Sequence, residues 1–138
     1  MVVTSEISLN TQGDGDILDI TAKVQKHVAD SCIQKGIVTV FVTHSTVGIT
    51  TIEFEPGLVA DLRKAWDRLV PKNIPYDHDA HWGDGNGYAH VRASLLGASL
   101  TVPFTESKLT LGTWQQIVVI DFDNRPRQRT VIVQVMGE

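Results

Sequence analysis

The segment from residue 76 to residue 90 carries the side chains best suited to bind a metal ion. It contains His78, His81 and His90, three of the five histidines of the chain, together with aspartates and glycines. Neutral imidazole binds borderline divalent metals, and carboxylates add charge or support the ligands. A hydrophobic core gains nothing from such a composition, so the segment predicts a functional site.

Another histidine, His44, follows a run of β-branched and apolar residues at positions 37–43. That run predicts a buried strand, and the end of a strand holds a ligand rigidly. His44, His78 and His90 together could supply three metal ligands and leave one coordination position open, which is the catalytic kind of site. Their spacing matches no zinc finger or metalloprotease helix, so a solvated polar loop and a hydrogen-bonded strand-end histidine remain as alternatives.

Carboxylates and arginines are the other candidates for chemistry. Glu53, at the end of the next predicted strand, is a candidate general base or ligand, with a carboxylate at a helix start as the alternative. Glycines between positions 83 and 87 could expose backbone amides to an anion. Guanidinium groups bind phosphate oxygens bidentately, although surface arginines usually contact only water, and the candidates are Arg92, Arg127 and Arg129.

The elements that must position these residues follow from the hydrophobic periodicity. Alternation at residues 3–10 predicts a strand, and apolar residues three to four apart predict a helix over 17–35. Pro56 begins a second helix that Pro71 ends, and a long loop then leads to a short helix at 89–96. Further strands are expected at 37–43, 47–52, 99–104, 108–111, 115–122 and 130–136. The pattern indicates an α+β fold of mostly antiparallel sheet with two or three helices.

Composition is typical of a soluble globular protein with one domain, residues 1–138. Apolar residues make up 42% of the chain and charged residues 20%. The net charge of −4 argues against non-specific binding to nucleic acid, which needs positive potential. The single cysteine, Cys32, and the lack of a signal-peptide pattern predict a cytoplasmic protein. No apolar stretch approaches the roughly 20 residues of a membrane span, so no membrane partner is expected.

Five short motifs occur in order along the chain. They are His44-Ser-Thr-Val-Gly-Ile-Thr-Thr-Ile-Glu53, Gly85-Asn-Gly-Tyr-Ala-His90, Arg92-Ala-Ser-Leu-Leu-Gly97, Leu111-Gly-Thr-Trp-Gln115 and the tail from Arg125-Pro-Arg-Gln-Arg129 to Gln134. Together they resemble the YjbQ-like family, also called the secondary thiamine-phosphate synthase enzyme family. The resemblance extends over essentially the whole chain.

The resemblance implies a small α+β sandwich that assembles as a homotrimer, with a metal-associated pocket near the subunit interfaces. It points to His44, His78 and His90 as the metal ligands, with zinc as the expected ion and magnesium or manganese as alternatives. Tyr88 stands where many relatives carry a histidine, and His81 is the candidate replacement for that histidine.

The activity implied by the resemblance is that of a weak thiamine-phosphate synthase, which couples a pyrimidine pyrophosphate to a thiazole phosphate. The expected ligand is a small phosphorylated metabolite held by the three arginines. Glu53 or Asp84 would act as a base or supporting carboxylate, with Thr113 and Gln115 near the pocket. Histidine ligands favour zinc over the magnesium that usually handles pyrophosphate, so a hydrolase using a metal-bound water is the alternative. A non-catalytic trimer that binds a metal or ligand is the third reading.

Overall fold

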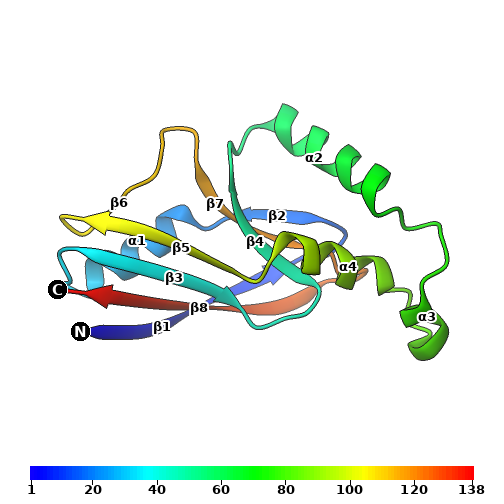
Figure 1. The fold of residues 1–138 in the computed structure, drawn as a ribbon, viewed down its shortest axis with the longest axis horizontal. Coiled ribbons are helices and arrows are strands. Elements are labelled where there is room, and N and C mark those ends of the chain that lie inside the picture. The colour runs from blue at the N-terminus through cyan, green and yellow to red at the C-terminus, as the bar shows by residue number, and fades with distance from the viewer.

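Two antiparallel β-sheets form the body of the molecule in the computed structural model, which describes residues 1–138 (Figure 1). The larger sheet has the strand order β1-β8-β3-β5-β6, with bounds Val2–Thr11, Arg127–Gly137, Gly36–Val42, Ser99–Thr105 and Lys108–Leu109. The smaller sheet has the order β2-β7-β4, with bounds Asp16–Asp19, Gln116–Asp121 and Val47–Ile52. All the strand pairs are antiparallel, so the predicted α+β class with mostly antiparallel sheet is confirmed.

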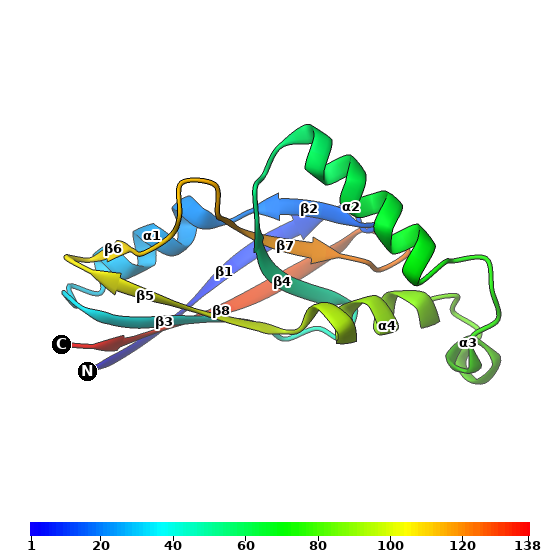
Figure 2. The same cartoon turned by 45° about the horizontal axis from the view of Figure 1, so that its top comes forward.

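Four helices complete the fold, one more than the sequence suggested. Their bounds are Thr21–Asp30 for α1, Pro56–Leu69 for α2, Asp77–Trp82 for α3 and Gly87–Leu96 for α4. Helix α2 lies on the side of the smaller sheet away from the larger sheet (Figure 2). Side chains of α2 and α4 pack there with Val118 and Ile120 of β7. None of the four helices has both the length and the apolar composition of a membrane span.

Strand β7 separates two hydrophobic cores. Its side chains alternate between the two faces of the sheet, as in any β-strand. Ile117 and Val119 point into the core shared with the larger sheet and α1, whereas Val118 and Ile120 pack with residues of α2 and α4. All four side chains are fully buried. The strand is therefore fixed from both sides, and so is the polar segment that follows it.

The structure departs from the predicted elements at three places, one of which is the end of the first helix, at Asp30 instead of residue 35. Residues 16–19 form β2, paired with β7, so α1 begins only at Thr21. The spacing of Ile17, Ile20 and Val24 also suits a helix, which is why periodicity alone extended the helix too far. The stretch predicted as a long loop contains α3, whose six mostly polar residues are too few to show an apolar periodicity.

One end of the molecule gathers the elements that carry the predicted site. β7 ends there at Asp121, β8 begins there at Arg127, and the connection from β3 to β4 carries His44. The first turn of α4 and the preceding helix α3 lie at the same end (Figure 1). Segments distant in the sequence thus place polar side chains next to one another.

Candidate functional site

Three potential metal ligands meet between α3 and α4. His78 lies in the first turn of α3, His90 lies in α4, and Asp84 lies on the connection between the two helices. One ligand atom from each of these residues lies within 4.8 Å of the other two. The two imidazole rings are 4.3 Å apart between centroids and tilted by 40°. This set of residues is called the His78–Asp84–His90 cluster below.

The connection between α3 and α4 is short and depends on glycine. Gly85 has a positive φ of 70°, in the left-handed region that most other residues avoid. Gly87 lies so close to Tyr76 that a Cβ atom added to it would stand 2.6 Å from the Tyr76 Cβ. The backbone N–H of Gly87 also donates a 2.8 Å hydrogen bond to the Asp79 carboxylate in α3. These close contacts hold the start of α4 against α3, and so hold His90 beside His78.

The His78–Asp84–His90 cluster fits a divalent metal. The Nδ1 atom of His78 is buried and has no hydrogen-bond partner, which is unusual for a buried polar atom. Its nearest acidic neighbours are Asp84 Oδ1 at 3.4 Å and Asp79 Oδ1 at 3.7 Å. Two imidazoles and one carboxylate form the donor set of several catalytic metal sites, in which other coordination positions stay open to water and substrate.

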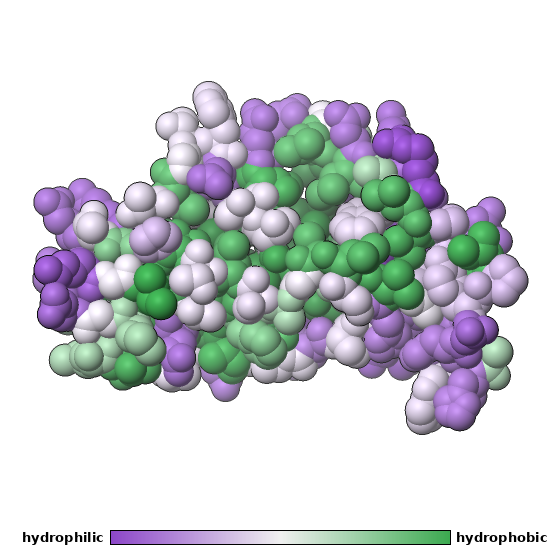
Figure 3. All heavy atoms as spheres, viewed as in Figure 1, coloured by the Kyte–Doolittle hydropathy of each residue, from purple (hydrophilic) through white to green (hydrophobic).

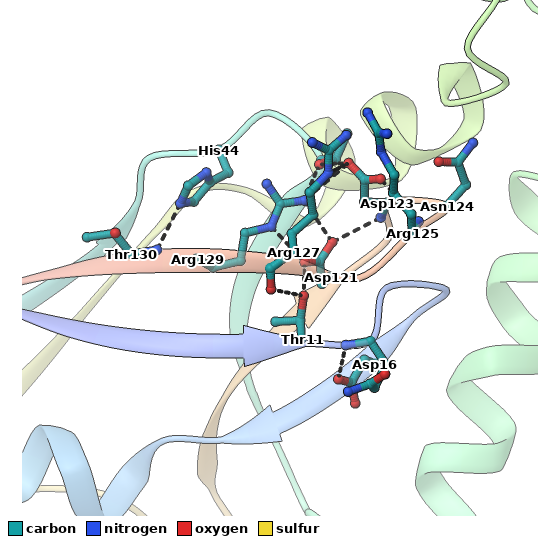
Figure 4. Close-up of polar contacts among 12 residues, drawn as sticks. Thr11, Asp16, His44, Asp121, Asp123, Asn124, Arg125, Arg127, Arg129 and Thr130 are labelled. Atoms are coloured by element: carbon teal, nitrogen blue, oxygen red, sulfur yellow. Dashed lines mark hydrogen bonds and ion pairs between the residues drawn. The ribbon is translucent and has the colours of Figure 1, made fainter.

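His44, the third predicted ligand, does not belong to this cluster. The backbone N–H of Thr130 in β8 donates a 2.9 Å hydrogen bond to the Nε2 atom of His44 (Figure 4). Because Nε2 accepts this bond, Nδ1 carries the proton of the neutral ring and can act only as a donor. Burial and the nearby positive charge of Arg129 lower the pKa of His44. The residue that lies beside His78 and His90 is thus Asp84 instead of His44. His44 is a neutral hydrogen-bond donor.

His44 nevertheless faces one pocket together with Asp84 and His90 of the cluster, and this pocket is called the histidine pocket below. Its volume is about 340 Å³ and none of its lining residues is hydrophobic. The lining comprises Thr43, His44, Ser45, Thr46, Asp84, Asn86, His90, Asp123, Arg127 and Arg129. A pocket with such walls suits a small, highly oxygenated ligand.

The floor of the histidine pocket is a buried network around Arg129. Its guanidinium group binds the Asp121 carboxylate through two hydrogen bonds of 2.7 and 3.1 Å, and it contacts Asp123 at 3.2 Å (Figure 4). Thr46 accepts a further 2.8 Å hydrogen bond from Arg129. Asp121 is 0% exposed, so its charge requires this partner. Asp121 and Asp123 neutralise the positive charge of Arg129, so this residue stabilises the floor of the pocket.

Asp123 connects this floor to α4. Its carboxylate accepts hydrogen bonds from Thr46 at 3.1 Å and from the side chain of Asn86, just before α4, at 3.3 Å. Burial by itself would raise the pKa of Asp123. These two hydrogen bonds and the charges of Arg127 and Arg129 outweigh that effect, so the pKa lies below its ordinary value. Asp123 is therefore a permanent negative charge under the pocket at neutral pH.

Arg127 is the arginine left to bind a ligand in the histidine pocket. Its Nε atom lies 3.4 Å from the Asp123 carboxylate but makes no hydrogen bond, and its side chain is 36% exposed. Arg92, by contrast, is 4% exposed and donates two hydrogen bonds to the carbonyl oxygen of Val70 at the end of α2. The structure places Arg92 outside the histidine pocket.

Three further predicted residues also lie elsewhere in the single chain. Glu53 is exposed beyond the far end of β4, and strand β4 separates it from Thr46 by about 20 Å, six residues at roughly 3.4 Å each. Glu55, rather than Glu53, caps α2 by accepting hydrogen bonds from two backbone N–H groups. Thr113 and Gln115 precede β7, at the end opposite Asp121, and neither lines the histidine pocket.

Asp123 and Asn86 also line the pocket, and neither was among the residues predicted for the site. Asp123 follows a strongly apolar strand, so the same strand-end argument that selected His44 could have found it. Asn86 stands just before α4, in a segment already noted for its histidines. His81 is exposed against Trp82, and Tyr88 is buried in the core beneath α4, so neither joins the cluster.

Comparison with known proteins relates the chain to one family over nearly its full length. The family described as "UPF0047 protein YjbQ-like" matches residues 5–138. A UPF0047 protein from Archaeoglobus fulgidus is 40% identical over 131 residues, which is 95% of this chain and 99% of the relative. Another, from Methanothermobacter thermautotrophicus, is 39% identical over 99% of this chain and 94% of the relative.

Solved structures agree with this relationship. A YbjQ-like protein of unknown function from Sulfolobus solfataricus superposes with a TM-score of 0.94 at 33% identity, covering 100% of this chain and 99% of its own. An uncharacterized conserved protein of the yjbq/upf0047 family from Clostridium acetobutylicum gives a TM-score of 0.88 at 38% identity, covering 96% and 99%. Both the sequence and the fold are shared from end to end, and the chain belongs to the YjbQ-like UPF0047 family.

Proposed function

We propose that this protein is a metal-dependent enzyme that acts on a small phosphorylated metabolite in the histidine pocket. The observation that carries the proposal is the buried His78 Nδ1 atom, which lacks a hydrogen-bond partner and lies beside His90 and Asp84. Zinc is the expected ion because two of the three donors are imidazoles, and manganese would also suit the set. A divalent ion held there would lower the pKa of a bound water molecule and polarise a phosphoryl oxygen.

The residues around the metal-binding cluster would bind and orient the phosphate. Arg127 presents a guanidinium group whose Nε is not hydrogen bonded, and guanidinium groups match phosphate oxygens. His44 is a neutral donor at the same pocket, because Thr130 occupies its Nε2 atom and leaves the Nδ1 proton available. Arg129, Asp121 and Asp123 form the rigid floor that keeps these groups in place.

Hydrolysis of a phosphate ester suits this pocket better than the coupling of two rings. The pyrimidine and thiazole rings of thiamine precursors would need apolar or aromatic walls, and no residue lining the pocket is hydrophobic. The thiamine-phosphate synthase activity implied by the family resemblance therefore stays a prediction, as does the cytoplasmic location.

We also propose that the chain assembles as a homotrimer. Thr113 and Gln115 belong to the most distinctive family motif, yet in one chain they lie at the opposite end of β7 from the histidine pocket. Between them Trp114 is 71% exposed, an unusual position for an indole unless another protein surface covers it. Hydrophobic side chains also gather in the middle of the face shown in Figure 3, between hydrophilic ends. Contact between copies would bury such surfaces.

Metal analysis of protein purified without chelator tests the proposed cluster. We expect one equivalent of metal per wild-type chain, and a loss of at least ten-fold in metal affinity in His78→Ala and in His90→Ala, because each removes one of three ligands. His81→Ala is the matched control, since that histidine lies outside the cluster. Metal content that is unchanged in His78→Ala and His90→Ala would contradict the assignment.

Turnover of glycerol phosphate with added zinc or manganese tests the reaction. Arg127→Gln should raise KM by about 10- to 150-fold, the loss expected for one charge-assisted hydrogen bond of about 1.5–3 kcal/mol, and change kcat less. Formation of thiamine phosphate from its two precursors, abolished in His78→Ala, would instead support the coupling reaction. Metal and phosphate binding without turnover of either kind would identify a non-catalytic binding protein.

A further inference from the structure

Helix α2 stands away from the sheet it covers. None of its 14 residues is fully buried, although Val59, Leu62 and Trp66 pack against the core beneath it. A cavity of about 160 Å³ lies between this helix and the smaller sheet. It shares no lining residue with the histidine pocket. It is called the α2 cavity below.

The walls of the α2 cavity are largely charged, although it lies over an apolar core. Ile17 and Ile120 form its base, and the start of β2 contributes Gly15. Its polar walls are Asp14, Arg63, Trp66, Asp67, Lys72 and Arg92. Arg63, Trp66 and Asp67 are spaced three and four residues apart on α2, so they share one face of the helix. Trp66 packs against the core on this face, and Arg63 and Asp67 lie exposed at the rim of the cavity.

Both carboxylates of the α2 cavity already have cationic partners. Asp67 accepts from the Arg92 guanidinium at 3.3 Å, and Asp14 pairs with the Lys72 ammonium group. Three cations line the cavity against these two acids, so one positive charge is left over. Arg63 is the cation that makes no ion pair. The electrostatic balance of the α2 cavity therefore favours an anion.

Hydrogen-bond donors are also in excess. The indole Nε1 of Trp66 is buried and has no partner, although an indole N–H can only donate and usually finds an acceptor when buried. Arg92 is almost fully buried, and its hydrogen bonds use Nε and Nη2, leaving Nη1 without one. Neither free donor has an acceptor within the protein. An acceptor brought by a ligand would satisfy both.

We infer that the α2 cavity is a second binding site, for a compact oxyanion such as inorganic phosphate or a short carboxylate. Arg63 and Arg92 supply positive charge, and the Trp66 N–H donates to one ligand oxygen. The cavity is smaller than the roughly 300–1,000 Å³ of pockets for larger organic ligands, so a nucleotide does not fit. This inference is independent of the function proposed for the histidine pocket.

The test is calorimetric titration of metal-free Arg127→Gln protein with phosphate and, separately, with acetate. The Arg127→Gln background removes the proposed anion-binding group of the histidine pocket. We expect saturable binding of one equivalent of at least one anion, with the tighter one identifying the chemical class. Adding Arg63→Gln or Trp66→Phe should weaken that binding at least ten-fold, because each removes a donor to a charged acceptor.

Two controls make the outcome decisive. Arg68→Gln removes an exposed cation that lies on α2 but does not line the cavity, and should leave the affinity unchanged. Arg63 is itself exposed, so Arg63→Gln remains informative if Trp66→Phe does not fold. No saturable binding of either anion would overturn the inference. So would an equal effect of Arg63→Gln and Arg68→Gln, because it would show a non-specific effect of charge.

Discussion

Charged side chains beneath the histidine pocket depend on partners that only the tertiary structure supplies. Asp121 ends β7 and Asp123 follows it, and Arg129 reaches both from β8 of the larger sheet. Removing one partner from such a buried group leaves an uncompensated charge, which typically costs about 3–5 kcal/mol. The pocket floor therefore belongs to the stability of the whole fold.

The lowered pKa of Asp123 predicts a specific dependence of stability on pH. The folded carboxyl group stays ionised at pH values where the unfolded one, with its ordinary pKa of 3.8, already binds a proton. The contribution of Asp123 to the free energy of unfolding is thus present above about pH 5 and is lost as pH falls through 3.8 toward the folded pKa. Urea unfolding measured between pH 3 and pH 7 gives the free energy of unfolding at each pH. This free energy should change less steeply with pH in Asp123→Asn than in wild type.

Asp61→Asn is the control for this measurement, because Asp61 is exposed on α2 and forms no ion pair. The free energy of unfolding of Asp61→Asn should depend on pH as it does in the wild type. The same pH dependence in Asp123→Asn would show that other carboxylates carry the acid sensitivity.

For individual residues, the amino-acid type predicted the location of the site better than it predicted the role of each residue in it. Composition selected His78 and His90, and the structure brings them together. Asp84 and His44 exchanged their expected positions because the fold, and not the residue type, decides which side chain has a backbone N–H beside it. The three arginines looked equivalent in sequence. In the structure they differ in burial and in hydrogen-bond partners.

Among the elements, the junction of α3 and α4 controls the geometry of the metal-binding cluster. Gly87→Ala would place a methyl group 2.6 Å from the Tyr76 Cβ, so the start of α4 must move. We expect the free energy of unfolding to fall by about 1–3 kcal/mol, the usual range for overpacking. Metal affinity should fall as well, because the shift separates His90 from His78.

Gly97→Ala is the matched control at the other end of α4. Gly97 has a positive φ of 99° but no atom within 4 Å of an added Cβ, so alanine there strains the backbone without pushing on a neighbour. It should lower stability while leaving metal affinity unchanged. If the two variants lose metal affinity equally, the α3–α4 junction is not what sets the geometry.

The elements themselves were predictable where their sequence pattern is strong. Pro56 begins α2 as expected, and the apolar strands β3, β4, β7 and β8 lie close to their predicted positions. β2 escaped prediction because its pairing with β7 is long-range, and α3 because a six-residue polar helix has no intrinsic stability to reveal it. Since His78 lies on α3, the cluster geometry could not be predicted either.

At the scale of the whole molecule, the trimer proposal predicts a specific role for Trp114. Trp114→Ala should shift the protein to smaller species in sedimentation velocity while leaving unfolding of the single chain nearly unchanged, because the indole is 71% exposed. Trp82→Ala removes an indole that is 69% exposed on α3 and should leave the assembly intact. A wild-type monomer, or equal effects of the two variants, would contradict an interface built on the loop around Trp114.

Strand β7, with one core on each face, also determines how the molecule can come apart. Neither layer can open by itself, since losing the larger sheet or the two outer helices would expose one apolar side of the same strand. The histidine pocket and the α2 cavity both border this strand, at Asp123 just beyond its end and at Ile120 within it. A ligand bound in either one should therefore raise the free energy of global unfolding of the entire chain, because binding is linked to folding.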